Sequence, residues 1–284
     1  MLNSYITKIN SATPGTGGGA NAGACAGQGK EGGTMWWKNL LQAALELVYP
    51  PRRQCPLCAG HSPDESICHA CRELLAGYAA EKFCPVCGSF MGPKQHRPQS
   101  AMLCQDCLAG SRPFDLARSV APYEGPLRDA VHRLKYHGRT GLARPLGLLM
   151  VEAALREPAF ERTQALVPVP LSPRREQQRG FNQALLLARE VGALLQAPVV
   201  EGAVVKIRET PAQTGLHRRE RLQNLLHAFA VAEPGAVVGK IIAIIDDVFT
   251  TGSTVSIISQ ILRQSGAAGV MVLTLAGARK TEKW

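Results

Sequence analysis

The sequence predicts an α/β domain with a mostly parallel β-sheet flanked by helices, preceded by a small cysteine-rich module. From residue 114 onward, short apolar runs alternate with segments whose apolar residues repeat at helical spacing, which is typical of a parallel sheet covered by helices. Before that, eight cysteines form four Cys-x-x-Cys pairs between residues 55 and 107. A chain of 284 residues is long enough for one such domain and a small module, but hardly for two full-sized domains.

The elements of the α/β domain follow from these patterns. Apolar runs of strand length predict strands at 119–123, 165–170, 199–200, 204–207, 241–246 and 269–277. Apolar residues at helical spacing predict helices at 125–155, with a break at Gly138, at 182–195 and at 253–266. In a sheet of this kind ligands bind at the carboxyl ends of the strands, so functional residues are expected directly after them.

Residues 1–34 differ in composition from the rest of the chain. They are rich in glycine, alanine, serine and asparagine and contain only three charged residues. We expect a disordered tail or a start site placed too early, because such a segment buries too little surface to offset its ordering entropy. The helical spacing of the apolar residues within 35–52 predicts an amphipathic helix. With no secretion signal and no membrane span in the sequence, we expect a cytoplasmic protein.

The paired cysteines predict structural zinc. A Cys-x-x-Cys turn brings two thiolates to one ion, and two such turns complete a tetrahedral site. Disulfides fit poorly with a chain that has no secretion signal, and a redox Cys-x-x-Cys usually occurs once, at a helix start. We therefore expect one or two closed Zn²⁺ sites. Their ligands would be Cys55, Cys58, Cys68, Cys71, Cys84, Cys87, Cys104 and Cys107.

The spacing of the pairs leaves two arrangements open. Gaps of nine and sixteen residues suit two ribbons formed one after the other, whereas a cross-braced arrangement would join the first pair to the third. His61 and His69 are left out because eight thiols already fill two sites. The module, residues 53–112, is too small to fold on its core alone, so metal ligation would contribute much of its folding free energy.

The net charge of +10 predicts a surface that attracts phosphate groups, either of a small ligand or of nucleic acid. One basic helical stretch, 128–144, is suited to track a phosphate backbone. Its Arg and Lys residues are Arg128, Arg133, Lys135, Arg139 and Arg144. An aromatic content of only 5% argues against an extended stacking surface for bases.

The stretch IIAIIDDVFTTGST, residues 241–254, predicts a ligand site. After a buried strand, Asp246 and Asp247 are expected at the rim of the sheet, where carboxylates accept hydrogen bonds from vicinal hydroxyls or help to hold a metal. The small residues that follow let backbone N–H groups and a helix N-terminus approach an anion. They are Thr250, Thr251, Gly252, Ser253 and Thr254. Together these features predict a ribose 5-phosphate site; a plain helix cap beside two solvated aspartates is the alternative.

Four features in combination resemble the ComF family (ComFC/GntX-type), which joins an N-terminal zinc ribbon to a type I phosphoribosyltransferase domain. The first is the cysteine array. The others are VPVP (167–170) followed by QRGFNQ (178–183), the basic stretch 208–229, and IIDDVFTTGST. The resemblance covers about residues 35–280 and implies a double zinc ribbon at 53–112 and a phosphoribosyltransferase-like domain at 113–284.

Family membership implies roles for the matched positions. Asp246 and Asp247 would be the catalytic pair that binds the ribose hydroxyls of 5-phosphoribosyl 1-pyrophosphate (PRPP), and residues 250–254 would hold its 5-phosphate. Mg²⁺ would accompany the pyrophosphate and improve it as a leaving group. The pyrophosphate turn would comprise Pro168, Val169 and Pro170, with added charge from Arg174, Arg175 and Arg179. A flexible loop over the site would contribute Lys206, Arg208, Arg218, Arg219 and Arg221.

Three activities remain open on this resemblance. The chain transfers a phosphoribosyl group, or it senses PRPP without consuming it, or it binds single-stranded DNA, since ComF relatives are associated with natural transformation and DNA uptake. Competence-machinery proteins are then expected partners. Relatives that use 6-oxopurines carry an aspartate where this chain has Thr250, so salvage of those bases is not expected. Gly180 and Asn182 are expected to serve as turn and helix-cap residues.

Overall fold

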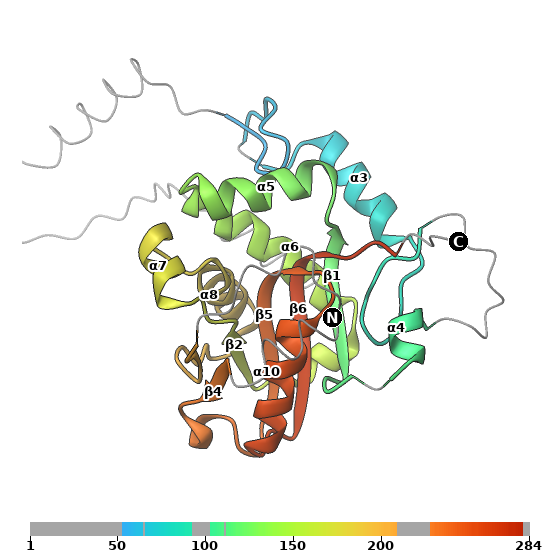
Figure 1. The fold of residues 1–284 in the computed structure, drawn as a ribbon. Coiled ribbons are helices and arrows are strands. Elements are labelled where there is room, and N and C mark those ends of the chain that lie inside the picture. Colours follow the sequence, from blue (N-terminus) through green and yellow to red (C-terminus); the bar gives the residue numbers. More distant parts are fainter. Residues whose placement is uncertain (1–52, 65, 93–102, 111, 209–227, 281–284) are drawn as a thin grey trace, which may run out of the picture. The chain divides into compact units, whose positions relative to one another are not determined.

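A computed structural model describes residues 53–64, 66–92, 103–110, 112–208 and 228–280 (Figure 1). The tail and the amphipathic helix expected within residues 1–52 lie outside these ranges. From Gln54 onward the described residues belong to one folded unit. None of the helices in the described ranges has the length and apolarity needed to cross a membrane.

The unit is built on a four-stranded sheet, as the sequence predicts. The strands are β1 (Leu116–Pro122), β2 (Ala165–Pro168), β5 (Ile241–Phe249) and β6 (Gly269–Gly277). Their order is β1-β6-β5-β2, and every neighbouring pair is parallel. The parallel direction brings the carboxyl ends of all four strands to one edge, which is the edge where the sequence places the candidate site.

One strand is longer than predicted, and this changes the placement of the acid pair. The predicted strand 241–246 continues to Phe249, because pairing with β6 extends through Val248 and Phe249. Asp246 pairs in register with Thr274, so both aspartates belong to the strand itself. The alternation of burial also continues past Asp246, with Asp247 and Phe249 buried. The polar residue types hid this continuation at the level of sequence.

The helices that flank the sheet agree with the predicted pattern. They are α5 (Gly125–Tyr136), α6 (Ala143–Leu155), α8 (Gln183–Leu195) and α10 (Ser253–Gln264). The predicted break at Gly138 is confirmed, since this residue adopts a φ of 61° and a 3₁₀ turn, Thr140–Leu142, separates α5 from α6. A short helix, α7 (Pro173–Arg179), was not predicted because its seven residues include no apolar period.

The smaller elements complete the described part of the chain. β3 (Val204–Lys206) and β4 (Phe229–Val231) form an antiparallel pair, and Val199 makes only an isolated bridge to Leu166. Two further 3₁₀ turns are Pro158–Arg162 and Pro234–Ala236. The cysteine-rich module contributes α3 (His69–Ala79) and α4 (Gln105–Leu108).

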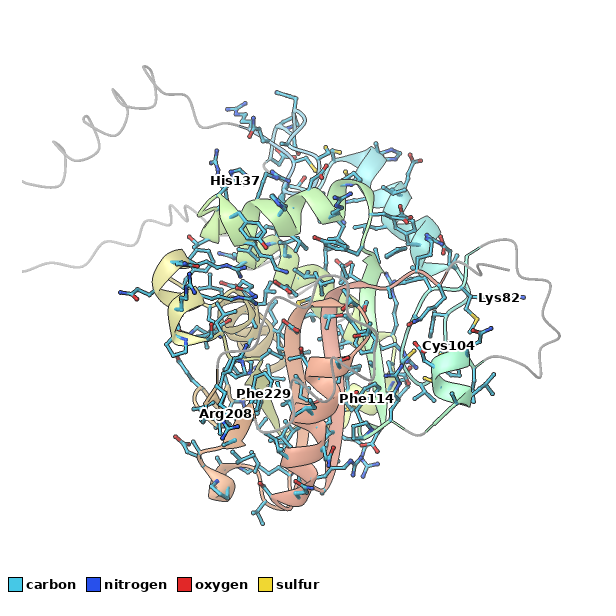
Figure 2. All side chains as sticks on the ribbon, in the orientation of Figure 1. Lys82, Cys104, Phe114, His137, Arg208 and Phe229 are labelled. Atoms are coloured by element: carbon cyan, nitrogen blue, oxygen red, sulfur yellow. The ribbon has the colours of Figure 1, made fainter. Side chains whose placement is uncertain are left out.

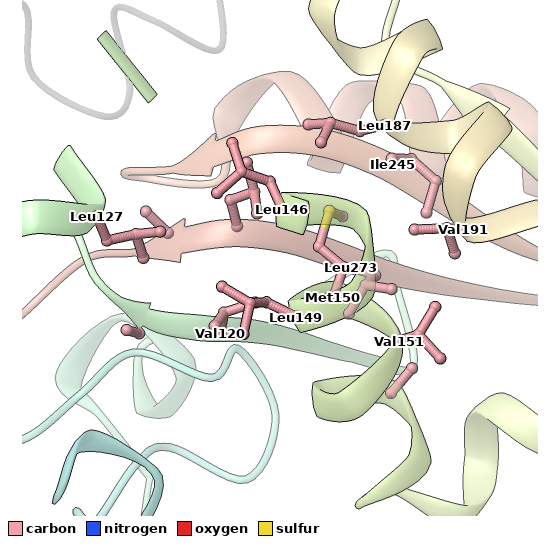
Figure 3. Packing of buried hydrophobic residues seen from close by; sticks show 14 of the residues in the cluster. Val120, Leu127, Leu146, Leu149, Met150, Val151, Leu187, Val191, Ile245 and Leu273 are labelled. Atoms are coloured by element: carbon pink, nitrogen blue, oxygen red, sulfur yellow. The ribbon is translucent and has the colours of Figure 1, made fainter. Parts of the chain in front are cut away.

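Both faces of the sheet are buried, so the side chains on both sides of its strands are mostly apolar. On one face α6 and α8 pack Met150 and Leu187 against residues such as Ile245 of β5 (Figure 3). On the other face α10 packs Ile258 against Ile244 and its neighbours. Each face therefore has its own apolar cluster, and the sheet separates the two.

The two ribbons pack against different faces of this core. Cys55 and Cys71 pack in the cluster of α5 and α6, whereas Cys84 and Cys104 pack in the cluster of α10. The end of the chain also reaches the second ribbon. Phe90 N donates to Ala278 O at 3.0 Å, and Lys280 N donates to Phe90 O at 2.8 Å, so residues 278–280 add a strand-like segment to the ribbon hairpin.

Candidate functional site

The acid pair lies near the carboxyl end of β5, within reach of a lysine from α5. Asp247 is buried, with 4% of its surface exposed, and Asp246 is partly buried. The Asp246 Oδ1 atom accepts a hydrogen bond from Asp247 N at 2.9 Å. Lys135 Nζ lies 2.8 Å from Asp247 Oδ2, and both side chains are largely shielded from solvent. The site is thus a buried triad of two carboxylates and one ammonium.

Burial and proximity set the charges of this triad. Burial, followed by repulsion from Asp247, raises the pKa of Asp246 to about 8, although Lys135 opposes the rise. Burial alone would lower the pKa of Lys135, but attraction to Asp247 outweighs it and raises that pKa. Near neutral pH, Asp246 therefore holds a proton, and the charged Lys135 lies against Asp247. The carboxyl groups of Asp246 and Asp247 together offer a hydroxyl donor and oxygen acceptors to a polyol.

The β5–α10 loop, residues 250–254, follows directly. Gly252 adopts a φ of 75°, and a Cβ atom there would lie 2.5 Å from Cζ of Phe249, so only glycine fits. Among the described residues no acceptor is bonded to the main-chain N–H groups of Thr250, Thr251 or Gly252. Thr251 Oγ1 and Ser253 Oγ lie 2.9 Å apart. Free amides, hydroxyls and the N-terminus of α10 form a place where an anion is favoured.

The turn after β2 lies beside the acid pair. Pro168 is in register with Ile245, and Val169 N donates to Ile245 O at 2.9 Å. Asn182 Nδ2 donates to Val169 O at 3.1 Å, while its Oδ1 accepts from Ala184 N at 2.9 Å. Asn182 therefore caps α8 as predicted and holds the turn at the same time. Gly180 has the predicted turn role, with a φ of 78°.

The structure brings some of the predicted site residues together. Those gathered at the carboxyl edge of the sheet are Asp246, Asp247, Thr250, Thr251, Gly252, Ser253, Thr254, Pro168, Val169 and Pro170. Arg179 lies at the end of α7, where its guanidinium carbon is 4.9 Å from the Tyr136 ring centroid and one nitrogen donates to Gln183. Arg174 and Arg175 are exposed on the same helix.

The remaining predicted basic residues lie elsewhere or outside the described ranges. Lys206 is on the β3–β4 sheet, where its ammonium lies 5.8 Å from the Phe229 ring centroid. Arg208 follows two residues later, and Figure 2 shows it near β4, well apart from His137 at the end of α5. Arg218, Arg219 and Arg221 fall within residues 209–227, which the structure does not describe.

From the sequence, Lys135 is expected among the basic residues of 128–144 that track a phosphate backbone. In the structure its side chain instead points inward and contacts Asp247. The helical period holds the signal that would have found it. Lys135 follows the buried Leu127 by eight positions and the buried Val131 by four, so it belongs to the same face of α5.

The cysteines form two clusters, in the sequential arrangement. The first cysteine cluster contains Cys55, Cys58, Cys68 and Cys71, and the second contains Cys84, Cys87, Cys104 and Cys107. Their sulfur atoms fit one tetrahedral zinc ion each. The Cys58–Cys68 and Cys87–Cys104 sulfurs are 3.7 and 3.5 Å apart, close to the roughly 3.8 Å that Zn–S bonds of about 2.3 Å require.

Backbone amides support both clusters. The amides of Gly60 and Cys68 approach the sulfurs of Cys58 and Cys55, each at 3.4 Å, and the Cys104 amide approaches Cys84 in the same way. Such N–H···S contacts stabilise thiolates, and no position among the four sulfurs is left for a reactive water. The clusters are therefore suited to a structural rather than a catalytic role.

Comparison with known proteins agrees with a double zinc ribbon at the cysteine clusters. Residues 44–108 match the family model of the double zinc ribbon domain. A DNA utilization protein, YhgH, of Escherichia coli is 37% identical over 78% of this chain and 92% of its own length. Competence protein F of Haemophilus influenzae is 31% identical over 79% of this chain and 97% of its own. The chain belongs to the ComF family.

Other relatives and solved structures are more distant from this ComF-family chain. Competence protein ComFC of Bacillus subtilis is 29% identical over 75% of this chain and 85% of its own. The B. subtilis glutamine PRPP amidotransferase structure is 19% identical, covers 50% of this chain and 30% of its own, and gives a TM-score of 0.34. At that TM-score the structural likeness adds nothing to the family assignment.

Proposed function

We propose that this ComF-family chain binds PRPP at the carboxyl edge of its sheet and serves DNA uptake or DNA processing. The single observation that carries the binding proposal is the adjacency of two recognition devices. An acid pair, Asp246 and Asp247, is followed after two residues by a loop whose amides have no acceptor among the described residues and by the N-terminus of a twelve-residue helix. A sugar with vicinal hydroxyls at one end and a phosphate at the other fits both.

The chain's own residues would perform distinct tasks on this ligand. Asp247, held in place by Lys135, accepts hydrogen bonds from the ribose hydroxyls, and Asp246 adds a carboxyl beside it. The amides and hydroxyls of the β5–α10 loop donate to the 5-phosphate. The turn at Pro168–Pro170, fixed by Asn182, faces the same edge and is suited to the pyrophosphate.

The triad fits a sugar better than a free divalent cation. Lys135 places a positive charge 2.8 Å from Asp247, and this ammonium would repel a metal ion bound by the same carboxylate. Mg²⁺ is therefore assigned to the pyrophosphate group of the ligand, where it neutralises charge and improves the leaving group.

The role in DNA metabolism is supported by the relatives. Their printed names describe DNA utilization in Escherichia coli and competence in Haemophilus influenzae and Bacillus subtilis. The net charge of +10 is consistent with a chain that meets nucleic acid in that role.

Calorimetric titration with PRPP and Mg²⁺ tests the binding proposal. The wild-type chain and the control Asp129→Asn, which removes an exposed carboxylate of α5, should bind alike. Asp246→Asn/Asp247→Asn should abolish the signal. Assaying the same mixture for released pyrophosphate, with candidate acceptors added, separates a transferase from a sensor. Equal binding by the double variant and the wild type would refute the proposed site.

A second function, contact with single-stranded nucleic acid, is favoured by one surface feature. Tyr136 is 59% exposed at the end of α5. Its ring lies 4.6 Å from the ring of His132 and beneath the Arg179 guanidinium, and His137 lies 5.8 Å from His132. An exposed ring beside a cation is suited to stack a base, which typically contributes about 1–3 kcal/mol.

Fluorescence anisotropy with a labelled oligothymidine tests this contact. Binding should weaken steeply with salt, persist in Asp246→Asn/Asp247→Asn, and fall about fivefold or more in Tyr136→Ala. Val238→Ala, which trims another exposed apolar residue, is the control. If Tyr136→Ala and Val238→Ala bind alike, Tyr136 has no part in nucleic-acid binding.

A further inference from the structure

The residues that follow the second cysteine cluster are fastened to the β5–α10 loop. Arg112 Nη1 donates to the main-chain oxygen of Thr251 at 3.2 Å, and this arginine side chain is only 1% exposed. Its other contacts belong to the cluster. Its Nη2 lies 3.7 Å from Asp106 Oδ2, next to the ligand Cys107, and the guanidinium opposes the rise that burial causes in the pKa of the Cys107 thiol. One buried guanidinium thus lies between the second cysteine cluster and the loop.

Apolar packing reinforces the same connection. Phe114 makes an edge-to-face contact with Phe249, with ring centroids 6.1 Å apart. Phe249 in turn fills the space beneath Gly252, and both rings share an apolar cluster with Cys84 and Cys104. Figure 2 shows Cys104 and Phe114 on the same side of the molecule.

The segment from Arg112 to Asp115 is fixed at its far end as well. Arg263 of α10 donates from Nε to Pro113 O at 2.7 Å and pairs with Asp115. Asp115 also accepts a hydrogen bond from Val270 N at 2.9 Å. The segment is therefore held by its neighbours on both sides.

Among the described residues, the first cysteine cluster has no comparable connection to the β5–α10 loop. Cys55 and Cys71 pack on the opposite face of the sheet, with residues of α5 and α6. The polar contact of that ribbon with α5 runs through Arg133, which donates to the main-chain oxygens of Pro56 and Leu57. The two clusters therefore differ in what they touch, which supplies an internal control.

We propose that Arg112 is a positioning residue that couples the second cysteine cluster to the β5–α10 loop, so that metal bound at this cluster sets the loop's affinity for its phosphoryl ligand. The ligand part rests on the proposed function. Four thiolates around one Zn²⁺ are net negative, so the loaded cluster provides Arg112 with a counter-charge and fixes Cys107 in place. The aligned guanidinium then holds the Thr251 carbonyl turned away from the ligand, with the loop amides facing the site.

Hydrogen exchange tests, without any ligand, whether Arg112 holds the β5–α10 loop in place. The Ser256 amide donates to Gly252 O at 2.8 Å and so reports on the loop. In the full zinc-loaded chain, Arg112→Ala should speed exchange of this amide by about tenfold or more, as expected for loss of a charge-assisted hydrogen bond. Arg112→Lys, which retains one charged donor, should fall between. Arg189→Ala, which removes an exposed guanidinium paired with the exposed Glu201, should leave the rate unchanged.

Metal release tests the coupling in the reverse direction. Coupling free energies are reciprocal, so PRPP with Mg²⁺ should slow zinc loss to a chelator. Differential alkylation of cysteines, read by mass spectrometry, separates the clusters. Protection should appear at Cys104 and Cys107, be absent at Cys55 and Cys58, and vanish in Arg112→Ala.

The outcomes separate this proposal from the proposed function. If Ser256 exchanges at the wild-type rate in Arg112→Ala, or if PRPP protects both clusters equally, the coupling is refuted. If Ser256 exchanges faster in Arg112→Ala as expected, but PRPP neither binds the wild-type chain nor protects either cluster, then Arg112 does hold the loop and the PRPP assignment fails.

Discussion

Replacing Gly252 by alanine should disturb the β5–α10 loop in a measurable way. Two costs add at this position. The backbone φ of 75° costs a residue with a side chain about 1–2 kcal/mol. The new Cβ would also meet Cζ and Cε2 of Phe249 at 2.5 and 2.9 Å, and displacing a packed ring costs about 1–3 kcal/mol. The free energy of unfolding should therefore fall by about 2–5 kcal/mol.

Gly202 provides the matched control. It has a φ of 81° with no atom within 4 Å of the position a Cβ would take, so Gly202→Ala should cost only the backbone part, about 1–2 kcal/mol. Urea unfolding of the zinc-loaded chain, followed by far-ultraviolet circular dichroism, measures both. Gly252→Ala should also weaken PRPP binding in calorimetry, whereas Gly202→Ala should not.

A double variant identifies the ring as the cause. Phe249→Leu removes the atoms that the new Cβ would meet, so Gly252→Ala should cost less in that background than in the wild type. Equal losses for Gly252→Ala and Gly202→Ala, or strictly additive effects with Phe249→Leu, would show that close packing beneath the loop does not enforce its shape.

Three further predictions concern charge and metal. Lys135→Met leaves Asp247 buried without its partner, so the free energy of unfolding should fall by about 3 kcal/mol; urea unfolding checks this, with Lys135→Arg as control. The folded-state pKa of Asp246, about 8, lies above its usual value, so this group's stabilisation is full below about pH 4 and is lost as pH rises towards 8. The melting temperature of Asp246→Asn relative to wild type should therefore increase from pH 5 to pH 8, and parallel pH profiles would contradict the assignment. Exhaustive chelation under denaturing conditions should release two zinc ions per chain, one per cluster, and a release of one would show that a cluster is not a zinc site.

Much of the fold could be predicted because its signals are local. The alternation of apolar runs with helical periods predicted the parallel sheet, and β6 spans the predicted residues, 269–277. Turn chemistry predicted the break at Gly138, the turn at Gly180 and the helix cap at Asn182. These features depend on a few neighbouring residues, which a single sequence displays directly.

The features that were missed depend on contacts between distant segments. The extension of β5 through Asp246 and Asp247 comes from pairing with β6, and the inward turn of Lys135 comes from packing of α5 on the sheet. Arg112 is 139 positions from Thr251, so nothing local marks it. The predicted roles of the PRPP-site residues remain predictions until ligand binding is measured.

The strand-like segment at residues 278–280 has a consequence for biosynthesis. Its main chain pairs with Phe90, and Arg279 bonds both Glu81 and Glu124, so it holds the second ribbon to the start of α5. A ribosome delivers the cysteines of that ribbon long before these three residues. A nascent ribbon can therefore acquire its metal early but can make these contacts only after residues 278–280 have been synthesised. Chains truncated before residue 278 would keep all the cysteines of the ribbon but lose the contacts that join it to the start of α5.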